Sequence, residues 1–206
     1  MAVVRVRISA AVEGPTDEAI ARRLIEAAGA EIGVVYGEHG KASLLQRLNG
    51  YNIAAGYAPW LVLVDLDRDA DCVPPFRAAC LPQPANTMCF RVAVHEVEAW
   101  LMADRQAMAH FLSVPMARIP LYPDQTPEPK RLIIDVAQRA RRREIREGIV
   151  PRIGSGRSVG ALYTSLMIQY VQTEWRLEEA EQNSDSLRRC RVRLQELVAR
   201  CNATIE

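Results

Sequence analysis

The sequence predicts an α/β fold, with a mostly parallel four-stranded sheet sandwiched by helices and an α-helical C-terminal extension. Strand-like segments alternate with helical ones in the first half, residues 60–64 form a strand-length apolar run, and strand signals fade after Asp104. Strands that alternate with helices are joined by right-handed crossovers, so they form parallel sheets covered on both faces.

The first predicted strand covers residues 3–12, which alternate apolar and polar side chains before becoming fully apolar. A helix follows with Thr16 as its N-cap, because Asp17 and Glu18 suit the positive end of a helix dipole. The other elements predicted in this half are strands over 31–36, 60–64 and 88–94 and helices over 42–48 and 96–103.

The second half predicts helices over residues 132–142, 158–170 and 187–201. They are preceded by a proline-rich stretch over 115–129 that cannot form a continuous helix. We therefore predict two parts: an α/β domain over residues 1–104 and an α-rich basic extension over residues 105–206 that packs on it.

The composition is that of a globular protein, with 49% hydrophobic and 25% charged residues in 206. No apolar run approaches the ~18 residues of a membrane span, and the N-terminus lacks a signal pattern. The five cysteines contain no C-x-x-C pair, which favours reduced thiols over a disulfide or zinc site. We therefore expect a cytoplasmic protein without membrane partners.

The net charge of +1 hides an asymmetry between the two halves. Residues 1–104 carry nine basic and thirteen acidic side chains, whereas residues 105–206 carry seventeen and twelve. An acidic half could hold a divalent cation and a basic half a polyanion, although solvated faces would give the same counts. Only Lys41 and Lys130 are lysines, and genome composition would explain such an arginine excess.

Acidic residues follow two of the predicted strands. Glu13 ends the first strand, and Asp65, Asp67 and Asp69 lie just beyond the third. In an open parallel sheet, ligands bind outside the carboxyl ends of the strands, so these carboxylates share one edge. If the D-x-D segment is extended, Asp65 and Asp67 point the same way while Leu66 returns to the core.

Clustered carboxylate oxygens without thiols favour Mg²⁺ or Mn²⁺ over zinc. The alternative is a solvated loop whose aspartates accept backbone hydrogen bonds. Four acidic residues lie within the seven positions 65–71, and they repel one another unless a cation or a basic neighbour offsets their charge. Arg68 alone would not suffice.

These motifs carry a family resemblance. Glu13-Gly14-Pro15-Thr16-Asp17-Glu18 after the first strand, with Asp65-Leu66-Asp67 after the third, resembles the Toprim domain of topoisomerases, primases, recombination protein R and overcoming-lysogenization-defect nucleases. The likeness covers residues 3–104. A second likeness, carried by residues 95–101 and by Lys130-Arg131-Leu132, is to small stand-alone Toprim-like bacterial proteins of unassigned function.

The resemblance implies a Toprim-like, Rossmann-like sheet with a magnesium site. Asp65 and Asp67 would bind one Mg²⁺ or Mn²⁺ ion, and Glu13 would act as a ligand or as general acid and base. In the nuclease branch a second metal is held by further acids, for which Asp17, Asp69 and Glu98 are the candidates here. Two metals would stabilise both the attacking and the leaving oxygen of a phosphodiester.

Several basic residues are candidates for contact with phosphates. Lys130 follows a rigid P-E-P segment and could stabilise developing phosphate charge. The candidates for nucleic-acid binding are Arg131, Arg141, Arg142 and Arg157. Solvated surface side chains are the competing interpretation for all of them.

The leading hypothesis is a Mg²⁺-dependent nuclease acting on DNA or RNA, in phage defence or DNA repair. The chain lacks G-x-x-x-x-G-K-[ST], so any linked ATPase would be a separate protein. One rival is a non-catalytic Toprim-like module that binds nucleic acid or a partner ATPase. Another, ranked lower, is a small-molecule phosphohydrolase. The oligomeric state and the number of metals stay open.

Overall fold

The computed structural model describes residues 5–37 and 39–205, which fall into two compact units. The first unit comprises the chain up to Val94 and the segment from Arg188 onward, and the second comprises His95–Leu187. Residues 3 and 4, where the first strand was predicted to begin, lie outside the described residues. The predicted division of the chain into residues 1–104 and 105–206 stays a prediction. It rests on charge and on the loss of strand signals, whereas the two units are defined by compactness.

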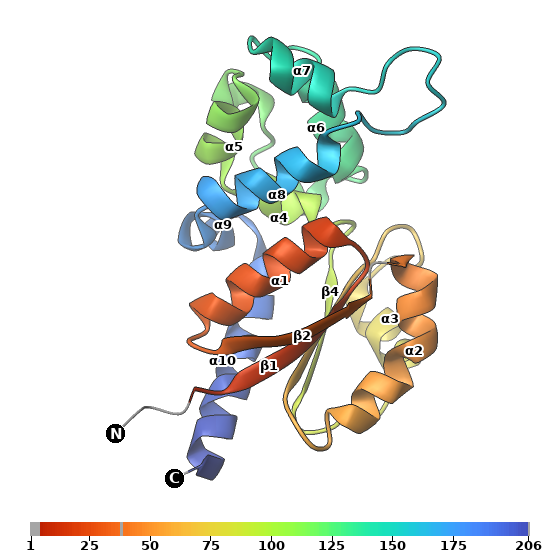
Figure 1. The fold of residues 1–206 in the computed structure, drawn as a ribbon, viewed down its shortest axis with the longest axis vertical. Coiled ribbons are helices and arrows are strands. Elements are labelled where there is room, and N and C mark those ends of the chain that lie inside the picture. The colour runs from red at the N-terminus through yellow and green to blue at the C-terminus, as the bar shows by residue number, and fades with distance from the viewer. Residues whose placement is uncertain (1–4, 38, 206) are drawn as a thin grey trace. The chain divides into compact units, whose positions relative to one another are not determined.

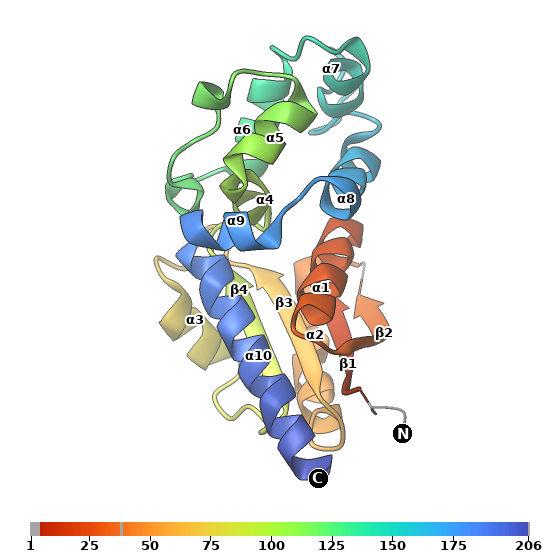
Figure 2. The ribbon, with the colours of Figure 1, turned by 90° about the vertical axis from the view of Figure 1, so that its left-hand side faces the viewer.

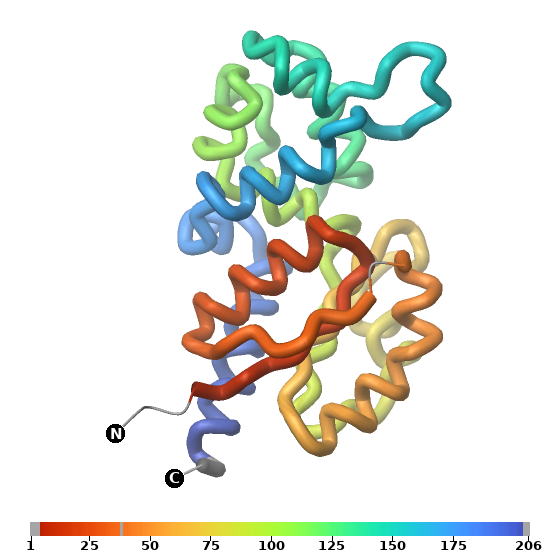
Figure 3. The backbone as a smooth tube through the Cα atoms, viewed as in Figure 1, coloured from red at the N-terminus to blue at the C-terminus, as the bar shows by residue number. Residues whose placement is uncertain are grey.

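The first unit is built on a sheet of order β2-β1-β3-β4, in which every neighbouring pair of strands is parallel (Figure 1). Its elements are β1 (Arg7–Val12), α1 (Pro15–Ala27), β2 (Glu31–Gly37), α2 (Gly40–Ala54), β3 (Trp60–Asp65), α3 (Val73–Cys80), β4 (Met88–Ala93) and the greater part of α10 (Asp185–Ile205). The tube in Figure 3 shows helices carrying the chain from one strand to the next. The predicted α/β class with its parallel four-stranded sheet is confirmed.

Both faces of this sheet are covered by helices, as continuous hydrophobic strands require. All six residues of β3 are buried. On one face, alternate residues of β3 and β4 such as Val62 and Phe90 pack with Leu44 and Leu48 of α2. The other face is covered by α1 and α10, which Figure 2 shows on the near side of the sheet.

Several element boundaries differ from the predicted ones. The first helix begins at Pro15 with Gly14 as its N-cap, so the N-cap assignment of Thr16 is wrong. Proline is well suited to the first helical position, because it has no N–H to leave unpaired there. The helix over 73–80 escaped prediction, because two prolines in its first turn read as a loop.

The described elements of the second unit are helices, and the sequence also predicted helices in the second half of the chain. Its elements are α4 (Glu98–Ala103), α5 (Arg105–Leu112), the short 3₁₀ helices η1 (Met116–Arg118) and η2 (Pro123–Gln125), α6 (Pro129–Ala137), α7 (Arg143–Ile149), α8 (Tyr163–Thr173) and α9 (Leu177–Asn183). Its core holds two tryptophans whose polar atoms are satisfied: Trp175 Nε1 donates to the Trp100 carbonyl oxygen at 3.2 Å, and Trp100 Nε1 donates to Ser186 at 3.1 Å. Such pairing is what buried indole groups require.

An ion pair joins two segments of this second unit. Arg176 donates to both carboxylate oxygens of Asp104, from Nε at 2.9 Å and from Nη2 at 2.7 Å. Asp104 also accepts the Ala107 N–H and thereby caps α5. Among residues 5–37 and 39–205, no helix combines the length and apolarity needed to cross a membrane.

Gly37 is required where β2 ends. Its φ of +119° lies in a region that side chains rarely adopt, and a Cβ there would collide with the Val12 carbonyl oxygen. We expect Gly37→Ala to lower the free energy of unfolding by about 2 kcal/mol or more, measured by urea denaturation.

Gly50 supplies the matched control, because it lies inside α2 with open space around a built Cβ. Gly50→Ala should leave stability unchanged or raise it by about 0.5–1 kcal/mol. Equal stability of the two variants would contradict the assignment of backbone strain to Gly37.

Candidate functional site

Glu13 and Asp65 come together at the carboxyl edge of the sheet. Glu13 follows β1, and its Oε1 accepts the backbone N–H of Asp65 at 2.7 Å. Asp65 is the last residue of β3 and is 7% exposed. The two residues are 52 positions apart, and the parallel pairing of β1 with β3 brings them to one edge. Glu13 and Asp65 therefore lie at the same edge of the sheet.

Asp67 does not continue the strand as the D-x-D pattern predicted. β3 ends at Asp65, and Asp67 has a left-handed backbone with φ of 52° inside a turn in which the Asp69 N–H donates to the Leu66 carbonyl oxygen. Alternation therefore does not set the direction of the Asp67 side chain, because the chain is no longer extended there. Leu66 is 2% exposed and does return to the core, as predicted.

Lys41, which no sequence pattern predicted to lie here, pairs with the two aspartates of the turn. Lys41, in the first turn of α2, places its Nζ 3.0 Å from Asp67 Oδ2 and 2.6 Å from Asp69 Oδ2. The same Nζ donates to the Leu66 carbonyl oxygen at 3.1 Å and lies 5.3 Å from the centre of the Phe76 ring. Lys41 is thus the basic neighbour that offsets the clustered acidic charge.

The pKa of Lys41 follows from these contacts. Burial of the side chain, which is 15% exposed, lowers the pKa by desolvation. Hydrogen bonds to Asp69 and Asp67 outweigh that effect, so the pKa is raised above its ordinary value. The ammonium group is therefore charged at neutral pH.

Asp17 also lies at this edge, in the first turn of α1, and is 7% exposed. Gly14, between Glu13 and this helix, has the Asp17 carboxylate beside it: a Cβ built on Gly14 would stand 3.4 Å from Asp17 Oδ2. The helix N-terminus favours a carboxylate in this position.

Glu98 belongs to the second unit and is described with it. It opens α4, is 2% exposed, and its Oε1 accepts the hydroxyl of Tyr163 at 3.0 Å. Its other oxygen, Oε2, is buried without a hydrogen-bond partner among the described residues. A buried, unsatisfied carboxylate oxygen is costly, so this residue calls for a functional explanation. Sequence reasoning missed Tyr163, because its spacing from Glu98 has no pattern.

Lys130 contacts two glutamates, Glu96 and Glu98. Its Nζ lies 3.5 Å from Glu98 Oε1 and 3.8 Å from Glu96 Oε1, and its N–H donates to Glu96 Oε2 at 2.7 Å. The helix predicted over residues 96–103 would place Glu96 and Glu98, two positions apart, on opposite sides. Because α4 begins only at Glu98, both side chains reach the same lysine.

The four arginines predicted to bind nucleic acid are all exposed. Arg131 pairs with Asp135 at 3.1 Å and Arg142 pairs with Glu144 at 3.0 Å. Arg141 and Arg157 are exposed, and Arg157 lines a cavity of about 640 Å³. Ion pairs of this exposed kind contribute little to stability, so they leave the arginines available to a polyanion.

Among the described residues, no group of three or more histidine, cysteine, aspartate or glutamate side chains is arranged to hold a metal ion. The oxygen donors of Glu13 and Asp65 have the chemistry that Mg²⁺ prefers. Asp67 and Asp69 are turned toward the Lys41 ammonium instead. The donor chemistry therefore fits a magnesium ion, while one further carboxylate would have to be released from Lys41.

Lys41→Met tests whether this ammonium stabilises the acidic turn. We expect the free energy of unfolding to fall by about 1 kcal/mol, a small value because Asp67 and Asp69 are 44% and 51% exposed. Added Mg²⁺ should raise the melting temperature of the variant more than that of the wild type, because the cation replaces the lost ammonium. Arg7→Met, which removes an exposed pair with Glu31, is the control and should have almost no effect.

The pH dependence has a definite sign. Because the Lys41 pKa is raised in the folded protein, the pair is fully stabilising at neutral pH and weakens only as the pH rises past the ordinary lysine value. The stability difference between wild type and Lys41→Met should thus stay constant from about pH 6 to pH 9. A difference that vanishes within this range would contradict the assignment.

Comparison of this chain with protein-family models, with curated proteins and with solved structures found no match. The resemblance to Toprim domains rests on the residues quoted for it, chiefly Glu13-Gly14 and Asp65-Leu66-Asp67.

Proposed function

We propose that this protein is a Mg²⁺-dependent, Toprim-like phosphodiesterase that acts on nucleic acid. The observation that carries the proposal is the meeting of Glu13 and Asp65 at the carboxyl edge of a parallel sheet. Ligands of open parallel sheets bind outside this edge. The aspartate-rich turn that follows β3 adds further oxygen donors next to the pair.

Glu13 and Asp65 would hold the magnesium ion, and Asp67 would join them once released from Lys41. When bound, the ion would polarise a phosphodiester and lower the pKa of an attacking water. Glu13 has a second task, because its Oε1 accepts the Asp65 N–H at 2.7 Å and so orients the end of β3. The ammonium group of Lys41, displaced from the aspartates, would remain nearby as a cation able to attract phosphate.

Residues of the second unit enter the proposal as binding groups. Arg131, Arg141, Arg142 and Arg157 would hold the polyanion through its phosphates, which makes binding strongly dependent on salt. Lys130 and Glu98 stay candidates for phosphate and metal contact, respectively. Action in phage defence or DNA repair, and cooperation with a separate ATPase, are part of the same hypothesis.

A second function is favoured by one specific observation. Lys41 already supplies a positive charge to Asp67 and Asp69, at 3.0 and 2.6 Å. In a non-catalytic Toprim-like module that binds nucleic acid or a partner ATPase, such a lysine would replace the metal permanently. The two functions differ in whether Mg²⁺ binds to the wild-type protein.

The proposal predicts metal-dependent cleavage that requires Asp65. Asp65→Asn and Glu13→Gln should lower the rate of DNA or RNA cleavage by about 100-fold or more, since the loss even of an outer-shell partner of a metal costs about 10- to 100-fold. Cleavage of labelled single-stranded, double-stranded and structured substrates over a Mg²⁺ and Mn²⁺ titration measures this. Glu31→Gln, an exposed glutamate of β2, is the matched control.

Calorimetry with Mg²⁺ alone separates the two functions. Wild-type protein that binds Mg²⁺, with weaker binding by Asp65→Asn, supports the phosphodiesterase. Wild-type protein that binds nucleic acid but no Mg²⁺, and a Lys41→Met variant that gains Mg²⁺ binding, would support the non-catalytic module. Cleavage that is equal in Asp65→Asn and wild type would overturn the proposed chemistry.

A further inference from the structure

The first unit contains a cavity of about 310 Å³ whose lining is dominated by arginine. Its lining residues come from α3, β4 and α10, and β4 is an edge strand of the sheet. The lining includes four arginines from these three elements: Arg77, Arg91, Arg193 and Arg200. None of them was singled out by the sequence, because they are spread over 124 positions.

Cys89 of β4 lines the same cavity as these guanidinium groups. All four arginines act on the Cys89 thiol electrostatically, although they come from different elements. Cys89 is buried on β4, and burial raises the pKa of its thiol to about 11. Cys190 is buried on α10, and burial raises the pKa of its thiol to about 12. Both thiols are therefore neutral at physiological pH and supply no negative charge.

The cavity consequently holds an excess of positive charge. Glu196 is the one carboxylate among the lining residues that the structure describes, and it pairs with Arg193 at 2.7 Å. With four guanidinium groups and one carboxylate, the described lining residues carry a net charge of +3. Repulsion between these arginines affects the pKa of Arg77. Desolvation is the largest cause that lowers this pKa, and the positive charges of Arg91 and Arg193 lower it further.

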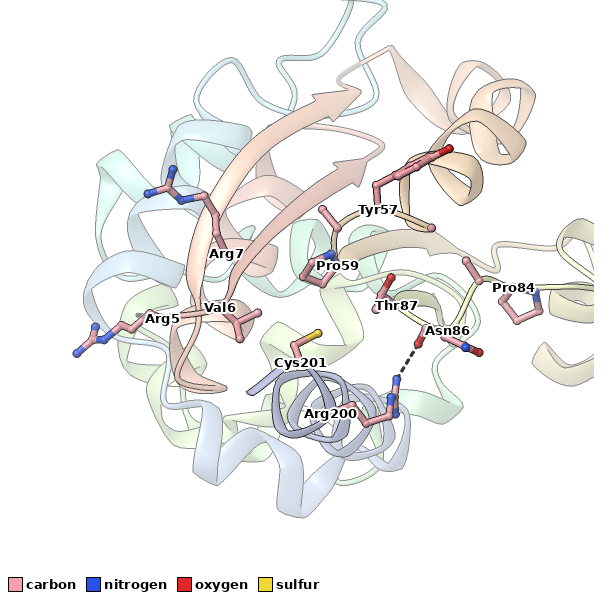
Figure 4. A pocket seen from close by; sticks show the side chains of 13 residues that line it. Arg5, Val6, Arg7, Tyr57, Pro59, Pro84, Asn86, Thr87, Arg200 and Cys201 are labelled. Carbon is pink, nitrogen blue, oxygen red and sulfur yellow. Dashed lines mark hydrogen bonds between the residues drawn. The ribbon is translucent and has the colours of Figure 1, made fainter. Parts of the chain in front are cut away.

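One buried hydrogen-bond donor of the cavity, the Nε atom of Arg91, has no partner among the described residues. Buried donors normally have a partner, so this nitrogen calls for one. Arg200 donates from Nη2 to the Asn86 carbonyl oxygen at 3.1 Å, the dashed contact in Figure 4. That arginine also lines the neighbouring cavity of about 950 Å³ drawn there, so the two cavities share a residue.

We propose that the arginine cavity formed by Arg77, Arg91, Arg193 and Arg200 binds the terminal phosphate group of a phosphorylated ligand. A phosphate monoester carries close to two negative charges and three acceptor oxygens, so it can accept from guanidinium groups on three elements. A carboxylate has one charge and two oxygens, so it would offset less of the net positive charge of the lining. The cavity is also at the lower end of the size range of small-ligand sites.

The site is independent of the proposed metal chemistry. It uses none of Glu13, Asp65 or Asp67, and its arginines lie on α3, β4 and α10. The phosphate could belong to a small molecule or to the phosphorylated end of a nucleic acid. Both sources offer the same group, and the ligands used in the experiment distinguish them.

Titration calorimetry on the full chain tests the proposal. The probes are inorganic phosphate, adenosine monophosphate, and one oligonucleotide with and without a terminal phosphate. We expect saturable binding of a probe with a terminal phosphate, weakened about tenfold or more by Arg77→Gln or Arg193→Gln. Both arginines are exposed, so neither change should unfold the protein, and equal melting temperatures verify this. Arg143→Gln, an exposed arginine of α7, is the matched control and should bind as the wild type does.

The outcomes separate cleanly. Tight binding of adenosine monophosphate identifies a small molecule as the source, and selective binding of the phosphorylated oligonucleotide identifies a nucleic-acid end. Absence of saturable binding by every probe would overturn the proposal. So would affinities unchanged in Arg77→Gln and Arg193→Gln, or equal binding of the oligonucleotide with and without its terminal phosphate when neither inorganic phosphate nor adenosine monophosphate binds.

Discussion

The acidic edge of the first unit depends on Glu13, which connects three elements at one point. Its carboxylate accepts the Asp65 N–H at 2.7 Å, and its carbonyl oxygen accepts the Gly40 N–H at 3.1 Å. One residue therefore ties the end of β1 both to the end of β3 and to the start of α2. Because Lys41 follows Gly40, this arrangement brings the lysine to the turn that follows Asp65. The side chain of Glu13 has a structural task beside any chemical one.

Part of the negative charge of residues 1–104 is therefore offset by a nearby lysine. The four aspartates at positions 65, 67, 69 and 71 are close enough along the chain to repel one another. The ammonium group of Lys41 offsets the charges of two of them, Asp67 and Asp69. The second lysine, Lys130, likewise lies within 4 Å of two glutamates. Both lysines of an otherwise arginine-based chain thus meet pairs of carboxylates. The sequence did not predict these contacts, because genome composition was a sufficient explanation for the small number of lysines.

Hydrophobic runs predicted β3 and β4 well, because these strands are almost fully buried and apolar at nearly every position. The proximity of Glu13 and Asp65 was predictable for the same reason, since parallel strands end at one edge. The direction of Asp67 was not, because the backbone turns into a left-handed conformation after Asp65. Lys41 and the arginine cavity escaped prediction because contacts between distant elements leave no spacing pattern. Conversely, Arg131 and Arg142, which do form local patterns, are paired with neighbouring carboxylates.

A lysine and a divalent metal are competing solutions to the same electrostatic problem. The ammonium carries one charge on a flexible stem, and its side chain is 15% exposed, so it offsets the aspartates without fixing their geometry. A magnesium ion carries two charges and demands an octahedral arrangement, so it would have to draw Asp67 from Lys41 toward Glu13 and Asp65. The free energy of that exchange includes the ion pairs that are lost, which are partly exposed and therefore weak. The ion pairs of Lys41 would therefore oppose metal binding only weakly, so their presence is compatible with both proposed functions.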